Sequence, residues 1–252
     1  MTTRPDPQLA RRAIGLIDLT DLSDTSSVAD VEGLCARAAT HGTAAVCVWP
    51  DFVARAAHVL RDSRVEIATV VNFPTGDERP FAVGVLTERA LADGATEIDV
   101  VVPYRAWLAG DTERPEQVLD AVRSLTTDAG AHVKVILETG MLPDLGAVDR
   151  IARFAVAHGA DFIKTSTGKT DVSATPDAVE AMLAVLADAD AMATGRIVGI
   201  KPSGGLRTAA DAAAYLAAAD RVMGAGWARP STFRFGASGL LDALLAVLDE
   251  EA

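Results

Sequence analysis

The sequence lacks several features that would place it in particular classes of protein. Its 252 residues include two cysteines, Cys35 and Cys47, which form neither a disulfide framework nor a CxxC motif. No apolar run approaches the roughly 18 residues of a membrane-spanning helix, and the opening MTTRPDPQLARR has no apolar signal core. A cytoplasmic protein is therefore expected, in which both cysteines are small buried hydrophobes.

Positive charge is also scarce and scattered. The net charge is -12 and there is no run of Lys or Arg. Nucleic acids and anionic membranes reward clustered positive charge, so the sequence argues against both as partners. Small molecules are expected instead. The oligomeric state is left open, with a homodimer as one option.

Lysine is particularly rare. Of 23 basic residues only four are lysine, namely Lys134, Lys164, Lys169 and Lys201. Arginine supplies the ordinary surface charge of this chain. Each lysine is therefore a candidate for a function that arginine cannot perform, above all one that requires the side chain to lose its proton.

Eight short segments are β-branched and apolar, as expected of strands that are covered on both faces. They are IDLTDL, AAVCVWP, VEIATVVNF, EIDVVVP, HVKVILET, FIKTST, IVGIKPS and RVMGAG. Strands alternating with helices predict one α/β domain over residues 1–252, a (β/α)8 TIM barrel, with residues 1–12 as an extension or short helix. An open doubly wound sheet would share this local pattern.

Helix boundaries support the same alternation. Helices are predicted to begin after Ser27, at Pro115, at Thr175 followed by Pro176, and after Thr208. The first is expected to stop near Gly42. The segments HGTAAV, DGATEIDV, AGAHVKV and HGADFIK each end a helix on glycine and enter a strand, which indicates one helix-to-strand joint used four times.

Charged residues occupy one face of several predicted strands. Period-2 alternation places Asp99, Lys134, Glu138, Lys164 and Lys201 opposite the aliphatic faces, and Asp18 can join them. If the aliphatic faces pack under the helices, these charges meet on the barrel axis. They form either an ion network that merely fills the barrel or a reactive centre near the carboxyl ends of the strands.

Two of these lysines lie near the ends of adjacent predicted strands. Proximity of Lys164 and Lys201, together with burial, disfavours a state in which both are protonated. Lowering a lysine pKa from near 10.4 by about 3 makes a large fraction nucleophilic at neutral pH. A neutral amine can add to a carbonyl and form a Schiff base, which is aldolase chemistry. Asp99 is a suitable carboxylate for the accompanying proton transfers.

Glycine-rich motifs follow three consecutive predicted strands. STGK contains Gly168 and Lys169, PSGGLRT contains Gly204 and Gly205, and RFGASGLL places Gly236, Ala237 and Ser238 at a predicted helix start. Backbone N–H groups in such turns can approach an anion, so their coincidence predicts a phosphate site. Each motif alone is weak evidence.

Two other kinds of site are disfavoured. KTSTGK is an incomplete P-loop because position 163 is Ile, so ATP binding is not supported. The four histidines fall in helix ends or strand starts without HxxxH or HExxH spacing, which argues against a metal-dependent aldolase mechanism. No cofactor is expected.

The motifs together resemble deoxyribose-phosphate aldolases over nearly the whole chain. The segments that carry the resemblance include TVVNFPTG, EIDVVVPYRAWLAG, GADFIKTSTGK, VGIKPSGGLRT and RFGASGLL. The resemblance implies reversible cleavage of 2-deoxy-D-ribose 5-phosphate to D-glyceraldehyde 3-phosphate and acetaldehyde, a step of deoxyribonucleotide catabolism, through a lysine Schiff base.

The resemblance also implies a role for each site residue. By motif position Lys164 is the Schiff-base lysine, Lys201 lowers its pKa and relays protons, and Asp99 transfers protons. Phosphate contacts fall on Lys169, Gly204, Gly205, Gly236 and Ser238, and substrate or relay contacts fall on Asp18 and Thr20.

The chain departs from the family pattern at two points. Gly239 stands where many relatives have a second serine, and LLAVLDEEA lacks a tyrosine-ending tail. Either difference would weaken phosphate binding or slow turnover. The alternatives are a Schiff-base aldolase for another or unphosphorylated aldehyde, and a non-catalytic phosphosugar-binding protein.

Overall fold

The computed structural model describes residues 6–191 and 196–250. Its strands are β1 (Ile17–Asp21), β2 (Ala45–Val48), β3 (Glu66–Val71), β4 (Glu97–Val101), β5 (His132–Ile136), β6 (Phe162–Lys164), β7 (Gly199–Lys201) and β8 (Phe235–Ala237). The helices are α1 (Pro7–Ile14), α2 (Val28–His41), α3 (Val53–Leu60), α4 (Pro80–Ala92), α5 (Tyr104–Leu108), α6 (Glu113–Ala129), α7 (Leu145–Ala157), α8 (Pro176–Ala191), α9 (Ala209–Met223) and α10 (Leu240–Asp249), with 3-10 turns η1 (Pro50–Phe52) and η2 (Thr139–Met141).

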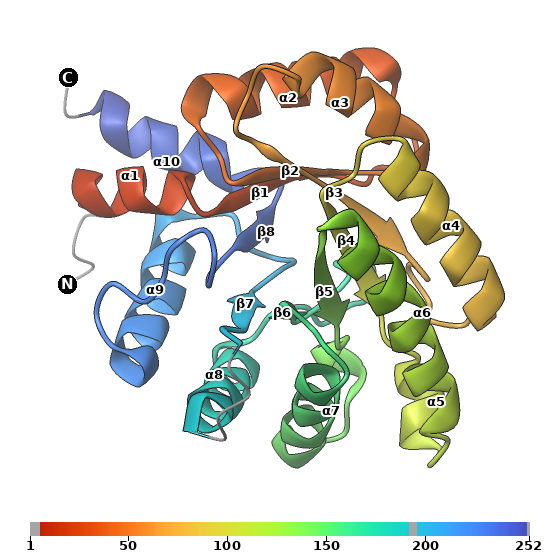
Figure 1. The fold of residues 1–252 in the computed structure, drawn as a ribbon. Helices are drawn as coiled ribbons and strands as arrows, with labels where there is room; N and C mark the ends of the chain where they lie inside the picture. Colours follow the sequence, from red (N-terminus) through yellow and green to blue (C-terminus); the bar gives the residue numbers. More distant parts are fainter. Residues whose placement is uncertain (1–5, 192–195, 251–252) are drawn as a thin grey trace.

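The eight strands form one parallel sheet that closes into a barrel. The strand order is β7-β6-β5-β4-β3-β2-β1-β8, and bridges from Ile200 to Phe233 and from Ser203 to Gly236 join its two ends. Figure 1 shows the helices arranged around the outside of this ring. The predicted TIM barrel is confirmed, and the open doubly wound sheet is wrong.

Local sequence signals set most helix boundaries. Ser27 and Thr208 each form a reciprocal capping box at the start of α2 and α9, as their spacing to an aspartate predicts. α8 begins at Pro176 as predicted, whereas α6 begins two residues before Pro115, at Glu113. The four glycines of the repeated helix-to-strand joint, Gly42, Gly94, Gly130 and Gly159, all have positive φ. Glycine reaches that conformation without a Cβ penalty.

The prediction for the eighth strand is wrong. Helix α9 begins at the capping box of Thr208 and ends at Met223, so the first residues of RVMGAG form its last turn. Strand β8 is formed instead by Phe235–Ala237, so Gly236 and Ala237 belong to a strand rather than to a helix start. Three residues are too few for an alternating pattern to mark a strand, and α10 begins only at Leu240.

The amino-terminal region contains a short helix, one of the two forms predicted for it. Asp6 caps α1, and Arg12 on this helix forms a bidentate ion pair with Asp220 of α9 at 2.8 Å. α1 also packs against α10 (Figure 1). Residues 1–5 lie outside the described part of the chain.

Candidate active site

The strand register brings the predicted catalytic residues together. Lys164 and Lys201 are partners across β6 and β7, and Asp99 and Lys134 are partners across β4 and β5. All four side chains are buried inside the barrel. The aliphatic residues between them pack under the helices, as period-2 alternation requires.

Asp99 is the centre of these contacts. Its Oδ2 accepts hydrogen bonds from the Nζ atoms of both Lys164 and Lys201 at 2.8 Å, and its Oδ1 accepts one from Lys134 Nζ at 2.9 Å. Asp18 lies on the other side of the cluster, with Oδ2 at 2.6 Å from Lys201 Nζ. Asp18 and Asp99 together therefore hold three lysines inside the barrel.

Two further charged side chains complete the network. Glu97 contacts Lys134 Nζ at 2.5 Å and accepts a hydrogen bond from Arg234 Nη2 at 2.8 Å. Arg234 Nη1 donates to Asp18 Oδ1 at 2.6 Å. Ion contacts thus run from Arg234 near the amino ends of the strands to Lys164 at their carboxyl ends.

Lys164 differs from the other lysines of the network in its protonation. Burial lowers its pKa, and the charge of Lys201 lowers it further, while Asp99 opposes the shift only in part. For Lys134, burial also disfavours the charged form, but the surrounding carboxylates outweigh it and raise the pKa. The pKa of Lys201 is raised for the same reason. The amine that readily becomes neutral is therefore Lys164.

The aspartates remain carboxylates. Burial alone would raise the pKa of Asp99, but Lys134, Lys164 and Lys201 outweigh it and hold that pKa well below its usual value. The pKa of Asp18 is lowered against burial in the same way by Lys201, Lys134 and Arg234. Both groups therefore accept hydrogen bonds from the lysines as carboxylates at physiological pH.

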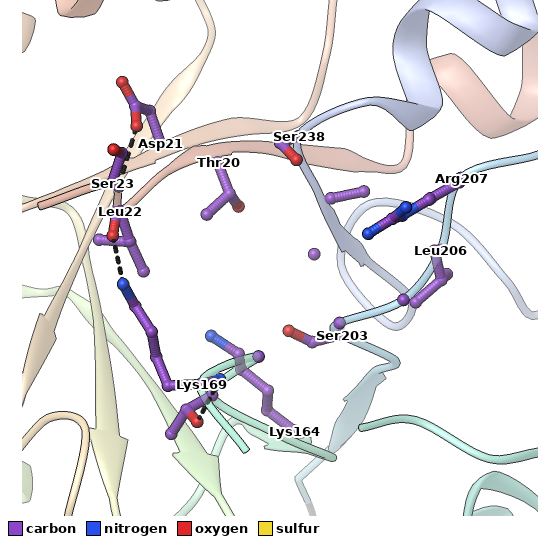
Figure 2. Close-up of a pocket in the computed structure, with 16 residues that line it drawn as sticks. Thr20, Asp21, Leu22, Ser23, Lys164, Lys169, Ser203, Leu206, Arg207 and Ser238 are labelled. Atoms are coloured by element: carbon purple, nitrogen blue, oxygen red, sulfur yellow. Dashed lines mark hydrogen bonds between the residues drawn. The ribbon is translucent and has the colours of Figure 1, made fainter. Parts of the chain in front are cut away.

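A cavity of about 340 Å³ opens above Lys164 at the carboxyl ends of the strands. Figure 2 shows Lys164 and Thr20 pointing into it, with Ser203 and Ser238 at its edge. The predicted phosphate contacts Lys169, Gly204, Gly205, Gly236 and Ser238 all line this cavity. Asp18, Asp99 and Lys201 are not among the lining residues and lie beneath Lys164, where they can act on the amine but not directly on a phosphate.

The glycines of this cavity are required for its shape. A Cβ on Gly204, where φ is +82°, would lie 2.5 Å from Ser173 Oγ. A Cβ on Gly236 would lie 2.7 Å from Ser203 Oγ and 3.0 Å from Lys201 Cε. A side chain at either position would therefore clash with these neighbours.

Lys169 crosses the mouth of the cavity. Its Nζ donates to Leu22 O at 2.8 Å (Figure 2). The same atom lies 3.3 Å from Asp24 Oδ1 and sits over the ring of Trp49. It thus ties the loop after β6 to the loop after β1. Arg207, also at the rim, was not predicted, although PSGGLRT contains it.

The scan of protein families matches residues 12–245 to the DeoC/LacD family of aldolases. The chain belongs to this family. A curated deoxyribose-phosphate aldolase of Agrobacterium fabrum is 46% identical to this aldolase over 244 residues, which span 96% of this chain and 92% of the relative.

Solved structures agree with this assignment. A candidate deoxyribose-phosphate aldolase of Coccidioides immitis is 31% identical, with a TM-score of 0.80 over 98% of this chain and 88% of that one. A similar candidate from Toxoplasma gondii is 25% identical, with a TM-score of 0.85 over 96% and 94%. The deoxyribose phosphate aldolase of Aeropyrum pernix, a tetramer, shares the fold at 23% identity and a TM-score of 0.77, covering both chains fully.

The sequence prediction for Glu138 is wrong in one respect. This residue follows β5 with φ of 54°, so its side chain leaves the line of the strand and does not join the lysine cluster. Its carboxylate accepts a hydrogen bond from Thr167 Oγ1 at 2.5 Å and one from Thr170 Oγ1 at 3.2 Å. Glu138 therefore supports the loop that carries Gly168 and Lys169.

Sequence reasoning missed Glu97 and Arg234. Alternation puts Glu97 on the same strand face as Asp99, but Glu97 was not included in the predicted charge cluster. Arg234 lies one residue before β8, a strand that was placed elsewhere. On the outer surface, ligand atoms of Glu116, Asp120 and His158 come within 4.8 Å of one another, outside the cavity lining, and exposed acidic groups of this kind are common without an ion.

Proposed function

We propose that this aldolase reversibly cleaves 2-deoxy-D-ribose 5-phosphate to D-glyceraldehyde 3-phosphate and acetaldehyde through a Schiff base on Lys164. The observation that carries the proposal is that Lys164 alone among the three networked lysines lines the cavity and has a lowered pKa. The 46% identity to a curated enzyme of that name supports the choice of substrate.

The chemistry follows from this arrangement. The neutral amine of Lys164 adds to the C1 aldehyde of the open-chain sugar, and loss of water gives a protonated imine. The C3 hydroxyl loses its proton, the C2–C3 bond breaks, and its electron pair enters the imine to give an enamine. C3 becomes the aldehyde of glyceraldehyde 3-phosphate. Protonation of the enamine and hydrolysis then release acetaldehyde and regenerate the amine.

Asp99 and Lys201 support the proton transfers. Because Asp99 Oδ2 accepts hydrogen bonds from both amines at 2.8 Å, it is placed to relay a proton between Lys164 and Lys201. Asp99 and Lys201 are buried below the cavity and do not line it. They therefore exchange protons with the substrate through Lys164 or through a water molecule beside Thr20. Asp18 maintains the charge of Lys201.

The phosphate is assigned to the rim formed by the loops after β6, β7 and β8. Gly205 and Ser238 offer backbone and hydroxyl donors, and Lys169 and Arg207 supply positive charge. The N–H groups of Gly204 and Gly236 already donate to Gly236 O and Pro202 O, so these two glycines contribute by leaving room for the anion. Loops at this end of a barrel, next to a helix start, favour anion binding. Comparing kcat/KM for deoxyribose 5-phosphate and deoxyribose tests this assignment, which equal values would contradict.

Incubation with acetaldehyde and borohydride, followed by peptide mass mapping, tests the proposed function itself. We expect a reduced two-carbon adduct on the peptide that carries Lys164. A chain that only binds phosphosugars gives no adduct. Modification confined to Lys201 or Lys134 would refute the assignment of the reactive amine.

One alternative aldolase activity has an observation in its favour. Gly239 leaves the amino end of α10 without a side-chain cap, next to Ser238 in the cavity wall, so one hydroxyl donor is missing from the rim. An aldolase preferring unphosphorylated aldehydes would tolerate this loss. The same comparison of the two sugars separates the activities.

Three further predictions stay proposals. We infer that residues 1–252 form one domain and that the protein is cytoplasmic, and a homodimer stays one option for its assembly. No helix in the described ranges is both long and apolar enough to span a bilayer. Sedimentation equilibrium tests the assembly, and a monomer or a tetramer would contradict the dimer.

A further inference from the structure

The basic side chains of the ion network outnumber its carboxylates. In the described part of the chain, contacts of 3.4 Å or less join four basic groups, Lys134, Lys164, Lys201 and Arg234, to three carboxylates, Asp18, Glu97 and Asp99. The network is therefore electrically balanced when one of the four basic groups is neutral.

Only one member is free to be that neutral group. Arg234 stays protonated at any physiological pH, and burial alone would lower its pKa, but Asp18 and Glu97 outweigh that effect. Lys134 contacts three carboxylates and Lys201 contacts two. Lys164 contacts Asp99 alone. Lys164, whose amine faces the cavity, is therefore the basic group that is neutral.

We infer that Arg234 and Glu97 are positioning residues that set the charge balance in which Lys164 is the uncharged amine. This inference rests on the proposed function, because it concerns the reactive state of the same lysine. Neither residue lines the substrate cavity. Both act through the chain of contacts from Arg234 by way of Glu97, Lys134 and Asp99 to Lys164.

The surroundings of Lys164 leave few other groups for this role. The charged or titratable side chains next to Lys164 are those of Asp99 from β4, Lys201 from β7 and Cys47 from β2. Asp18 from β1, Glu97 from β4, Lys134 from β5 and Arg234 before β8 lie deeper in the barrel, and β3 contributes the apolar residues Ala68 and Val70. Asp21, Lys169 and Arg207 line the cavity above Lys164, and Glu138 is bonded to Thr167. Burial raises the pKa of the Cys47 thiol, which keeps it neutral. Cavity charges are solvated and weaker in effect.

Arg234 occupies a built site. Its guanidinium donates to Asp18, Glu97 and the carbonyl of Pro230, and it lies over the ring of Phe162 at 5.4 Å. Arg234 and Glu97 also line a second cavity, of about 640 Å³, at the amino ends of the strands. A small cation can therefore reach the position of the guanidinium from outside, without passing through the substrate cavity.

Removing the charge of Arg234 and removing the charge of Glu97 must shift the acid limb of the pH profile of kcat/KM in opposite directions. Removing the cation in Arg234→Met leaves an excess of carboxylates, so Lys164 holds its proton more tightly and the limb moves to higher pH. Removing the anion in Glu97→Gln moves it to lower pH. A shift on the order of one pH unit is expected for each, and the double variant returns close to the wild type.

The experiment measures the pH dependence of kcat/KM for deoxyribose 5-phosphate and, separately, of acetaldehyde–borohydride adduct formation at Lys164. Arg234→Lys, which keeps the charge, is the matched control and should retain the wild-type profile. In Arg234→Ala, guanidinium at tens of millimolar should restore the profile, whereas urea, its neutral isostere, should not.

Several results would overturn the inference. They are folded single variants with the wild-type profile, shifts in the same direction for both, a shifted Arg234→Lys profile, or equal rescue by urea. If Arg234→Met does not fold, Glu97→Gln and Arg234→Lys carry the test. Failure of the proposed function is distinct, because the wild type would then form no adduct at Lys164.

Discussion

Lys164 and Lys201 share one oxygen atom of Asp99, each with its Nζ 2.8 Å from Oδ2. The two amines lie on adjacent strands in register, and they differ in their second contact. Lys201 has Asp18 beside it, whereas Lys164 has the cavity. Burial therefore lowers the pKa of Lys164, while the two aspartates overcome burial at Lys201.

Replacing the neighbouring cation should make Lys164 harder to deprotonate. In Lys201→Leu the repulsion from Lys201 is lost and Asp99 has one partner fewer, so the pKa of Lys164 rises. The acid limb of kcat/KM should move up by on the order of one pH unit, with about tenfold lower activity near neutrality. A pH profile of kcat/KM measures this, and a limb at the wild-type position would contradict the coupling.

Restoring a hydroxyl beside Ser238 should strengthen phosphate binding. A Cβ on Gly239 would meet nothing within 4 Å, and the residue is the N-cap of α10. Gly239→Ser is therefore expected to raise the ratio of kcat/KM for deoxyribose 5-phosphate over deoxyribose by roughly tenfold, the value of one charge-assisted hydrogen bond. Gly239→Ala is the control, and an equal gain in both variants would contradict a role for the hydroxyl.

Two glycines should respond oppositely to alanine. A Cβ on Gly199 would lie 2.4 Å from the Phe162 ring, under the Arg234 guanidinium, so Gly199→Ala should cost about 1–3 kcal/mol of unfolding free energy. Gly33, exposed within α2, has nothing within 4 Å, and Gly33→Ala should stabilise by roughly 0.5–1 kcal/mol. Urea unfolding checks both. Equal effects would contradict the packing described around β7.

The free energy of unfolding should fall in acid. The pKa values of Asp18 and Asp99 are depressed in the folded protein, so their contribution is complete above the unfolded value of about 3.9 and is lost as pH falls toward the folded values. Urea unfolding at several pH values should therefore show a loss that begins below about pH 4. A flat dependence between pH 7 and pH 3 would contradict the charged state of the buried aspartates.

Strand periodicity was sufficient to locate the buried charged cluster. Alternation in EIDVVV and FIKTS placed Asp99 and Lys164 on the axis, and both lie there with Lys134 and Lys201. Helix caps were equally informative, since a capping box is a local device whose two hydrogen bonds depend on residues three apart.

Other features depended on contacts that sequence patterns do not encode. β8 has three residues, and its place in the ring is set by hydrogen bonds to β1 and β7 rather than by its own pattern. Arg234 was missed with it. Glu138 left the axis because its backbone turns at positive φ, and the loop around Thr167 supplies its hydrogen bonds.

The scarcity of lysine allows a direct measurement of the central claim. With 13C placed at the lysine Cε atoms, this chain gives four side-chain NMR signals, and Lys164→Met identifies one by its loss. The account predicts that the Lys164 signal titrates at a pH well below those of Lys134 and Lys201. A Lys164 signal that stays protonated up to the ordinary lysine pKa near 10.4 would contradict it.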